Sequence, residues 1–457
     1  MINFKNKKVA ILGWGINGSD AANYLLEQGA KITIFDEKER KEFDFSDFDI
    51  KQSKLILGRQ YLREGLSNFD FIFRAPGVYR YLPEIIEAEK KGVVVTSVVK
   101  LFFDLCPARI IGVTGTKGKG TTSTLIYQIL KKDGKDVYLA GNIGAPILEL
   151  LPKLNSSSLV VLELSSFQLI DMTKSPHLAV VLNITEDHMD WHKDRDEYVK
   201  SKINIVKFQN EDDYAVLNYD YETSKDFSKY TKAEIKYLST KRKVEGCYVK
   251  DVYFILEVGS RTYEVGETKN LLLRGKHNWE NVCAAACASY LADASIDSIK
   301  QSVFSFKGLE HRLELVAEVK GIKFYNDSFS TNPQTTIAAI RSFEEPLTLI
   351  LGGSDKGLNY DEMGKEIAKR KNIKNIVLIG EISNFIKKSI DKAKYNGEIL
   401  KLGKTDIEKV VETCFEITPK GGVILLSPAT ASFDMFGNYK ERGKKFKEAV
   451  KRLKITE

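Results

Sequence analysis

A loop rich in glycine and lysine, residues 114–122, contains the residue types that bind nucleotide phosphates. Its sequence, TGTKGKGTT, lies between an apolar strand pattern and a helix pattern. In the common loop, G-x-x-x-x-G-K-[ST], backbone N–H groups surround the phosphates, the lysine reaches the terminal oxygens and a hydroxyl meets Mg²⁺. Here the first glycine of that pattern is missing and Gly120 follows Lys119. The loop predicts a nucleotide site in which Thr121, Thr122, a backbone group or water replaces the missing hydroxyl.

Two later motifs offer ligands for Mg²⁺. Glu163 lies in LELSSFQL at the end of an apolar run, and His188 lies in NITEDHMD, just after another run. Because α/β sheets bind ligands at the carboxyl ends of their strands, both side chains are predicted to reach the nucleotide site. Taken singly, an ordinary strand-end acid and a packed or exposed histidine remain the alternatives.

A second glycine-rich turn, GWGING at residues 13–18, also follows a strand pattern and precedes a helix pattern. Asp36 ends the next strand pattern, close to the spacing of a ribose-binding acid in a dinucleotide fold. The glycines let the backbone approach a pyrophosphate at a helix N-terminus. A dinucleotide such as NAD and a UDP-sugar both meet this requirement, and a tight turn without a ligand is the third interpretation.

The elements that carry these motifs form three successive α/β segments. Strand patterns alternate with helix patterns along the chain, which predicts parallel sheets. The expected strands are 8–12, 31–35, 69–73 and 93–96, then 110–114, 159–164 and 179–183 with a strand-rich stretch at 214–273, and finally 347–351, 375–379 and 423–426. We expect three domains: 1–99, 100–308 and 309–457.

Composition limits the class of protein. Of 457 residues, 43% are hydrophobic and 29% charged, which is typical of a globular protein, and no apolar run is long enough to span a membrane. The N-terminus lacks the apolar core of a signal peptide, and the five cysteines lack zinc-site spacing. The net charge of +7 is spread along the chain without a basic stripe. These features predict a cytoplasmic protein that binds small anions, with no nucleic-acid or membrane partner.

Eight motifs in one order carry a resemblance to a known family. They are TGTKGKGTT, ELSSFQL, NITEDHMD, HNWEN (277–281), EHRLE (310–314), NDSFSTNP (326–333), LGGSDKG (351–357) and SPATASFDMFGNYKERG (427–443). Over residues 8–445 the chain resembles the Mur ligases, and most of all the branch that joins D-glutamate to UDP-N-acetylmuramoyl-L-alanine (UDP-MurNAc-L-Ala) in peptidoglycan precursor synthesis. The resemblance implies a Rossmann-like N-terminal domain, a central P-loop ATPase-type domain and a Rossmann-like C-terminal domain.

The resemblance also implies a reaction and its residues. ATP would activate the substrate carboxylate as an acyl phosphate, which the amino group of D-glutamate displaces. ATP would contact Gly115, Thr116, Lys117, Gly118, Lys119, Gly120, Thr121, Thr122, Asn278, Asn281, Arg312 and Asp327. Two Mg²⁺ ions would be held by Thr121, Glu163, His188 and Lys202, the last as a carbamate formed with CO₂. The UDP-sugar would contact Gly15, Ile16, Asn17, Asp36 and Asn142. D-Glutamate would contact Lys356, Ser432 and Tyr439. The catalytic residues would be Lys119, Glu163, His188 and Lys202.

Two departures from the family pattern concern the amino acid. Phe329 stands where the family usually has lysine, which removes a cation near the pocket, and Tyr439 stands where phenylalanine is commoner. They leave open a related ligase that adds a different amino acid, with L-glutamate the first candidate. An NAD-dependent dehydrogenase would leave the phosphate loop unused, and a nucleotide-switched binding module lacks sequence support. We expect a monomer.

Overall fold

The computed structural model describes the chain except residues 1–2, 44, 46–47, 49, 190 and 456–457. The chain forms two compact units. The first comprises Met1–Asn270 and Trp279–Phe304, and the second comprises Leu271–Asn278 and Ser305–Glu457. The first unit contains two sheets and the second contains one.

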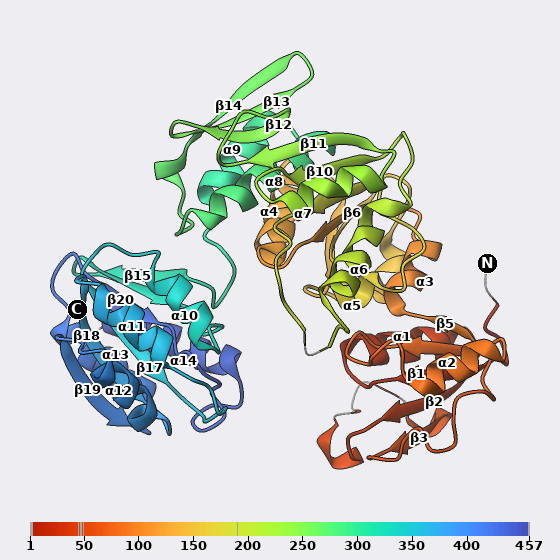
Figure 1. The fold of residues 1–457 in the computed structure, drawn as a ribbon, viewed down its shortest axis with the longest axis horizontal. Coiled ribbons are helices and arrows are strands. Elements are labelled where there is room, and N and C mark those ends of the chain that lie inside the picture. The colour runs from red at the N-terminus through yellow and green to blue at the C-terminus, as the bar shows by residue number, and fades with distance from the viewer. Residues whose placement is uncertain (1–2, 44, 46–47, 49, 190, 456–457) are drawn as a thin grey trace. The chain divides into compact units, whose positions relative to one another are not determined.

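The N-terminal sheet has five parallel strands in the order β3-β2-β1-β4-β5 (Figure 1). β1 pairs with β2 on one side and with β4 on the other, so the order in which strands are added to the sheet reverses at β1. Sheets of this kind bind ligands at such a point. The glycine-rich turn 13–18 begins at this point. The elements are β1 (Lys8–Leu12), α1 (Ile16–Glu27), β2 (Lys31–Asp36), η1 (Arg40–Glu42), η2 (Ile50–Gln52), β3 (Ser53–Leu57), β4 (Phe71–Arg74), α2 (Pro83–Lys90), β5 (Val94–Thr96) and α3 (Val98–Leu105).

The central sheet has nine strands in the order β14-β13-β12-β11-β10-β9-β6-β8-β7. Strands β6 to β12 run parallel, so the segments that follow β6, β8 and β9 open at one edge. The strands are β6 (Arg109–Thr114), β7 (Val137–Gly141), β8 (Leu159–Glu163), β9 (Leu178–Val181), β10 (Tyr214–Asn218), β11 (Glu234–Ser239), β12 (Gly246–Lys250), β13 (Tyr253–Val258) and β14 (Arg261–Glu267). The helices are α4 (Lys119–Lys132), η3 (Leu148–Lys153), α5 (Ser166–Leu169), α6 (Arg195–Lys207), α7 (Glu222–Lys225), η4 (Asp226–Tyr230), η5 (Thr268–Asn270), α8 (His277–Leu291) and α9 (Ile296–Ser305).

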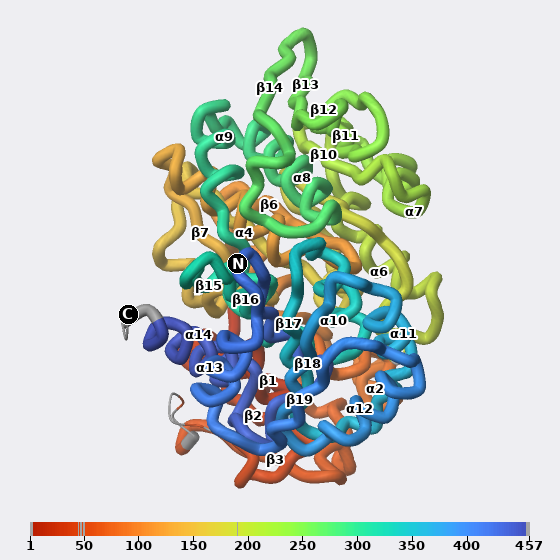
Figure 2. The backbone as a smooth tube through the Cα atoms, turned by 90° about the vertical axis from the view of Figure 1, so that its left-hand side faces the viewer, coloured from red at the N-terminus to blue at the C-terminus, as the bar shows by residue number. Residues whose placement is uncertain are grey.

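The last three strands of this sheet differ from the rest. β13 pairs antiparallel with both β12 and β14. The β13–β14 hairpin projects beyond its neighbours (Figure 2). The site described below lies instead around β6, β8 and β9.

The sheet of the second unit has the order β15-β16-β20-β17-β18-β19, parallel except for the β15–β16 pair. Alternate residues of its strands face opposite layers, since Leu349 and Leu351 pack with α10 to α12 while Ile350 packs with α13 and α14. The elements are β15 (Glu314–Val319), β16 (Ile322–Asn326), α10 (Pro333–Ile340), β17 (Leu347–Gly352), α11 (Asp361–Lys369), β18 (Ile373–Ile379), α12 (Ser383–Lys392), β19 (Glu398–Gly403), α13 (Ile407–Ile417), β20 (Val423–Leu426) and α14 (Tyr439–Ile455).

The predicted α/β class, with three mostly parallel sheets, is confirmed. No helix in the described part of the chain is both long and apolar enough to cross a membrane.

Candidate active site

The phosphate loop joins β6 to α4 and is held in an open shape by its glycines. Gly118 caps the helix with φ of 88°, in the left-handed region that disfavours side chains. A Cβ atom there would lie 2.2 Å from Oδ1 of Asn281, so the backbone approaches α8 more closely than any other residue allows. Helix α4 thus begins directly at the phosphate loop, and the N-terminus of a helix favours anions.

Two lysines converge on one carbonyl of this loop. Nζ of Lys119 donates to the carbonyls of Gly115 (2.9 Å) and Thr116 (3.0 Å), and Nζ of Lys202 donates to the carbonyl of Gly115 (3.1 Å). Lys202 is 1% exposed and also reaches Oγ1 of Thr114 (3.3 Å). Burial, assisted by the Lys119 ammonium, holds the pKa of Lys202 well below its ordinary value. No local pattern predicts such burial for a helix lysine.

The structure distinguishes the two candidate hydroxyls. Thr122 is fully buried and its Oγ1 donates to Oδ1 of Asn281 (3.3 Å), behind the loop. Gly120 is buried as well, whereas Thr121 is partly exposed at the start of α4. Thr121 is therefore the threonine that is placed to offer a hydroxyl to a metal ion, and Asn281 supports the loop from behind.

Glu163 ends β8, beside β6, and is 5% exposed. The side-chain amide of Asn142 donates to Oε1 of Glu163 (3.1 Å), and the Asn142 N–H donates to the Glu163 carbonyl (3.0 Å). The structure thus brings together a residue predicted to hold Mg²⁺ and one predicted to contact the UDP-sugar. Glu163 also acts electrostatically on Lys202, favouring its charged form.

His188 lies in the segment after β9, with φ of 56° and an exposed side chain. Its Nε2 is 3.5 Å from Oδ2 of Asp187, and its ring contacts that of Phe167 in the ELSSFQL motif (centroids 4.8 Å apart). A positive φ is uncommon for a residue other than glycine. In this conformation the imidazole of His188 packs against the ring of Phe167. The two predicted Mg²⁺ motifs therefore meet at His188 and Phe167.

Buried contacts that the sequence analysis missed fix these segments to one another. Nδ1 of His192 donates to Oε2 of Glu197 (3.2 Å), and its Nε2 lies 2.9 Å from Oγ of Ser166, whose hydroxyl can donate to it. The hydroxyls of Tyr198 and Thr116 are 2.8 Å apart, and burial raises the pKa of Tyr198 to about 12. The phosphate loop, the ELSSFQL segment and α6 are thereby tied together around Lys202.

The turn 13–18 has the accessible backbone expected of a ligand-binding loop. Gly15 is exposed, Ile16 is 71% exposed and Asn17 is partly exposed at the start of α1. The carboxylate of Asp36 accepts hydrogen bonds from the N–H groups of Trp14 (2.7 Å) and Lys38 (3.0 Å). Asp36 therefore holds the turn 13–18 through Oδ2 and the segment that follows β2 through Oδ1.

In the second unit, Arg312 and Asp327 surround the start of the NDSFSTNP motif. Asp327 accepts hydrogen bonds from Oγ of Ser427 (2.8 Å) and the N–H of Leu313 (3.1 Å), and burial raises its pKa to about 6. The guanidinium carbon of Arg312 lies 3.8 Å from the ring centroid of Phe329. A cation therefore stands beside the position where the family's lysine is absent.

Asn278, the other asparagine of HNWEN expected to contact ATP, belongs to the second unit, whereas Asn281 belongs to the first. Its side-chain amide donates to the carbonyl of Arg274 (2.6 Å) and contacts Nε2 of His277 (3.2 Å). The two asparagines of HNWEN thus have different surroundings.

The predicted amino-acid ligands lie on segments that follow neighbouring strands, β17 and β20. Lys356 is exposed and Ser432 is 2% exposed. The two segments are joined where Oγ1 of Thr430 donates to the carbonyl of Ser354 (2.6 Å). Tyr439 begins α14, and its ring contacts that of Phe329 (centroids 5.1 Å apart).

Arg442 is a further residue that the sequence analysis missed. It is 1% exposed, and its guanidinium donates to the carbonyls of Ser328 (3.0 Å), Thr430 (3.2 Å) and Ala431 (3.3 Å). Burial lowers the pKa of Arg442 to about 10. This side chain holds together the segments on either side of Ser432 and Phe329.

The donor set of the first unit fits a metal-bound polyphosphate. The N-terminus of α4 and the Lys119 ammonium suit phosphate oxygens, and Thr121, Glu163 and His188 offer the oxygen and nitrogen ligands that a divalent ion accepts. A carbamate on Lys202 would add another anionic oxygen. The arrangement can place a phosphoryl group between cations.

Three family models match the chain. They are a Mur ligase MurD-like N-terminal domain over residues 7–97, a Mur ligase middle domain over 113–289 and a Mur ligase glutamate ligase domain over 311–430. Two curated relatives are named UDP-N-acetylmuramoylalanine–D-glutamate ligase. That of Acetivibrio thermocellus is 42% identical, covering 98% of this chain and 96% of its own. That of Clostridium tetani is 39% identical, covering 98% and 97%. The crystal structure of a UDP-N-acetylmuramate-alanine ligase, MurC, from Thermotoga maritima shares the fold, with a TM-score of 0.61, 17% identity and coverage of 99% and 100%.

Proposed function

Because the chain belongs to the Mur ligase family, we propose that it joins D-glutamate to UDP-MurNAc-L-Ala with ATP, releasing ADP and phosphate. The observation that carries this proposal is the pair of lysines on the carbonyl of Gly115, next to a buried strand-end glutamate and a MurD-like N-terminal domain. We place the activity in the cytoplasm, as part of peptidoglycan precursor synthesis, and expect a monomer.

In this proposal the chain's residues act mainly by bringing anions together. Lys119 and the N–H groups at the start of α4 hold the terminal phosphates of ATP, where fixed positive charge stabilises the transferring phosphoryl group. Two Mg²⁺ ions, held by Thr121, Glu163, His188 and carbamoylated Lys202, would neutralise the phosphate charge further. Asn142 would orient the UDP-sugar beside Glu163.

The second unit would supply the amino acid and further contacts to ATP. Lys356 would pair with the side-chain carboxylate of D-glutamate, and Ser432 and Tyr439 would hold its α-carboxylate. Arg312, Asp327, Asn278 and Asn281 would contact ATP.

We expect phosphate release from ATP only when UDP-MurNAc-L-Ala and D-glutamate are both present. A panel of D- and L-amino acids, with phosphate and the ligated product measured together, tests this. Turnover with L-glutamate in place of D-glutamate would establish the second candidate, which the departures at Phe329 and Tyr439 leave open. Absence of turnover with every amino acid would contradict a ligase of this kind.

The Phe329 ring gives a further prediction. A cation over an aromatic face is stabilised by about 0.5–1 kcal/mol at a partly exposed site. Phe329→Leu removes that face from Arg312 and should raise KM for ATP about 2- to 5-fold. Phe329→Tyr keeps the ring and serves as the matched control. Steady-state kinetics at saturating D-glutamate provide the measurement, and equal KM values for the two variants would exclude this role.

A further inference from the structure

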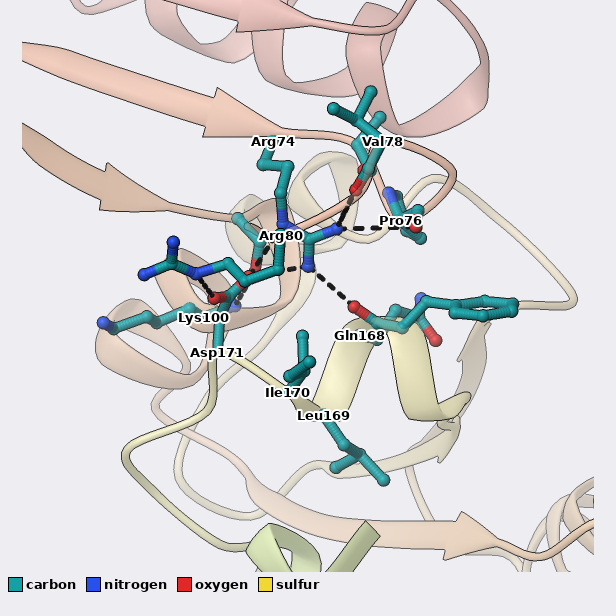
Figure 3. Close-up of polar contacts among 12 residues, drawn as sticks. Arg74, Pro76, Val78, Arg80, Lys100, Gln168, Leu169, Ile170 and Asp171 are labelled. Carbon is teal, nitrogen blue, oxygen red and sulfur yellow. Dashed lines mark hydrogen bonds and ion pairs between the residues drawn. The ribbon is translucent and has the colours of Figure 1, made fainter. Parts of the chain in front are cut away.

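Arg74 lies outside the phosphate-loop and amino-acid motifs and hydrogen-bonds to both the N-terminal and the central parts of the first unit. Arg74 ends β4, and its side chain is 0% exposed. Nε and Nη2 both donate to Oδ2 of Asp171 (2.9 and 2.6 Å), and Nη2 also donates to the carbonyl of Phe167 (2.8 Å). Figure 3 shows this guanidinium between the two parts of the first unit.

The remaining nitrogen of Arg74, Nη1, hydrogen-bonds to the loop 75–78 of its own domain. Nη1 donates to three carbonyls, those of Ala75 (3.2 Å), Pro76 (3.4 Å) and Val78 (2.7 Å). All three nitrogens of the guanidinium therefore have partners, as burial of this charge requires. A lysine cannot reproduce this planar fork of donors.

The Asp171 carboxylate is held equally closely. It is 6% exposed, and each of its oxygens is taken by a different arginine. Oδ2 accepts from Arg74, and Oδ1 accepts from Nε of Arg80 (2.5 Å), whose Nη2 pairs with Glu89 (2.6 Å). A buried ion pair is weak evidence for stability but a good means of fixing one geometry.

The segments joined by this pair lead to two different parts of the proposed site. Loop 75–78 packs on the glycine-rich turn, because a Cβ atom on Gly13 would lie 2.9 Å from Cβ of Ala75 and 3.2 Å from Cγ2 of Val78. Nε1 of Trp191 also donates to the carbonyl of Gly77 in this loop (3.2 Å). One end of the link therefore supports the turn 13–18.

The other end follows the strand that carries Glu163. Asp171 and Phe167 lie just beyond β8, in a segment tightened by a reciprocal cap in which Ser165 and Gln168 bond each other's backbone N–H. A shift at Asp171 would therefore be passed to the ELSSFQL segment.

We propose that Arg74 and Asp171 are positioning residues that fix the turn 13–18 relative to the strand end at Glu163. They would set the span between the uridine-diphosphate end of the substrate and its reacting carboxylate. This inference rests on the proposed function, because it takes a sugar nucleotide as the ligand that bridges the two sheets. Misplacing reacting groups by about an ångström can cost up to about 100-fold in rate.

The test compares two ligands that use different parts of the site. In the full-length chain, Arg74→Lys and Asp171→Asn are each expected to raise Kd for UDP-MurNAc-L-Ala about 10-fold, measured by calorimetry, because a site that is no longer preorganised must be ordered when the ligand binds. Kd for ADP, which binds at the phosphate loop, should change less than about 2-fold. Glu87→Gln, which breaks the exposed Glu87–Lys91 pair of the same domain, is the matched control and should change neither value.

A double variant keeps the test decisive if a single change unfolds the protein. The double variant Arg74→Met with Asp171→Leu removes both charges of the buried pair at once. Replacing both members of a buried ion pair by apolar residues is often neutral for stability. The weaker binding of UDP-MurNAc-L-Ala should persist in this variant. Unchanged Kd for both ligands, or equal weakening of both, would overturn the positioning role. Failure of the unmodified protein to bind UDP-MurNAc-L-Ala would overturn the proposed function instead.

Discussion

Replacing Lys119 by alanine is expected to lower kcat for phosphate release by about 10²- to 10³-fold, the usual cost of losing one fixed contact to developing charge. The ammonium donates to the loop carbonyls of Gly115 and Thr116, and Lys119 is itself the first residue of α4. Because Lys119 is only partly buried, its removal should leave the fold intact. Phosphate release measured at fixed times gives kcat, and the thermal unfolding temperature of the same sample shows whether the fold is intact.

Lys132→Ala is the control for this prediction. Lys132 ends the same helix and is exposed, so its removal takes one positive charge from α4 far from the loop. Its kcat should match that of the unmodified protein. Near-normal turnover by Lys119→Ala would show that the loop does not hold the reacting phosphates.

Lys202→Ala is expected to lower turnover about 100-fold, because in our proposal the lysine carries a carbamate that helps hold Mg²⁺. Carbamate formation needs the neutral amine, whose nitrogen attacks CO₂ and then loses a proton. Burial and the neighbouring Lys119 depress the pKa of Lys202, which increases the fraction of neutral amine at a given pH. The distance of 3.1 Å from Nζ to the Gly115 carbonyl places the new carboxylate beside the phosphate loop.

Two measurements separate this role from a structural one. With ¹³C-labelled bicarbonate, the unmodified protein should give the NMR signal of a carbamate carbon, and Lys202→Ala should give none. Lys200 is an exposed lysine on the same helix, so Lys200→Ala is the control and should keep the signal. A short carboxylic acid in the buffer should partly restore the turnover of Lys202→Ala. An unmodified Lys202 in the ligand-bound enzyme, together with full activity of the variant, would refute the carbamate.

Much of the fold was predictable where strands are buried on both faces. β1 (Lys8–Leu12) and β20 (Val423–Leu426) have the predicted bounds, and both are apolar runs inside their sheets. Four of the strands that the patterns missed lie at sheet edges: β3, β7, β15 and β19. Their residues are mostly half-buried, so their sequences lack the continuous apolar run of an inner strand.

The sequence by itself determined the family and most of the proposed site residues, because each motif is contiguous and its spacing is set by one turn between a strand and a helix. Only the tertiary structure revealed the surroundings of Lys202 and the roles of Arg74, His192 and Arg442. Arg74 meets Asp171 across 97 positions of the chain, and Arg442 meets Ser328 across 114. Arg442 and Ser328 lie within quoted motifs, but no local pattern shows that either pair meets, because burial and hydrogen bonding of this kind arise only when distant segments pack together.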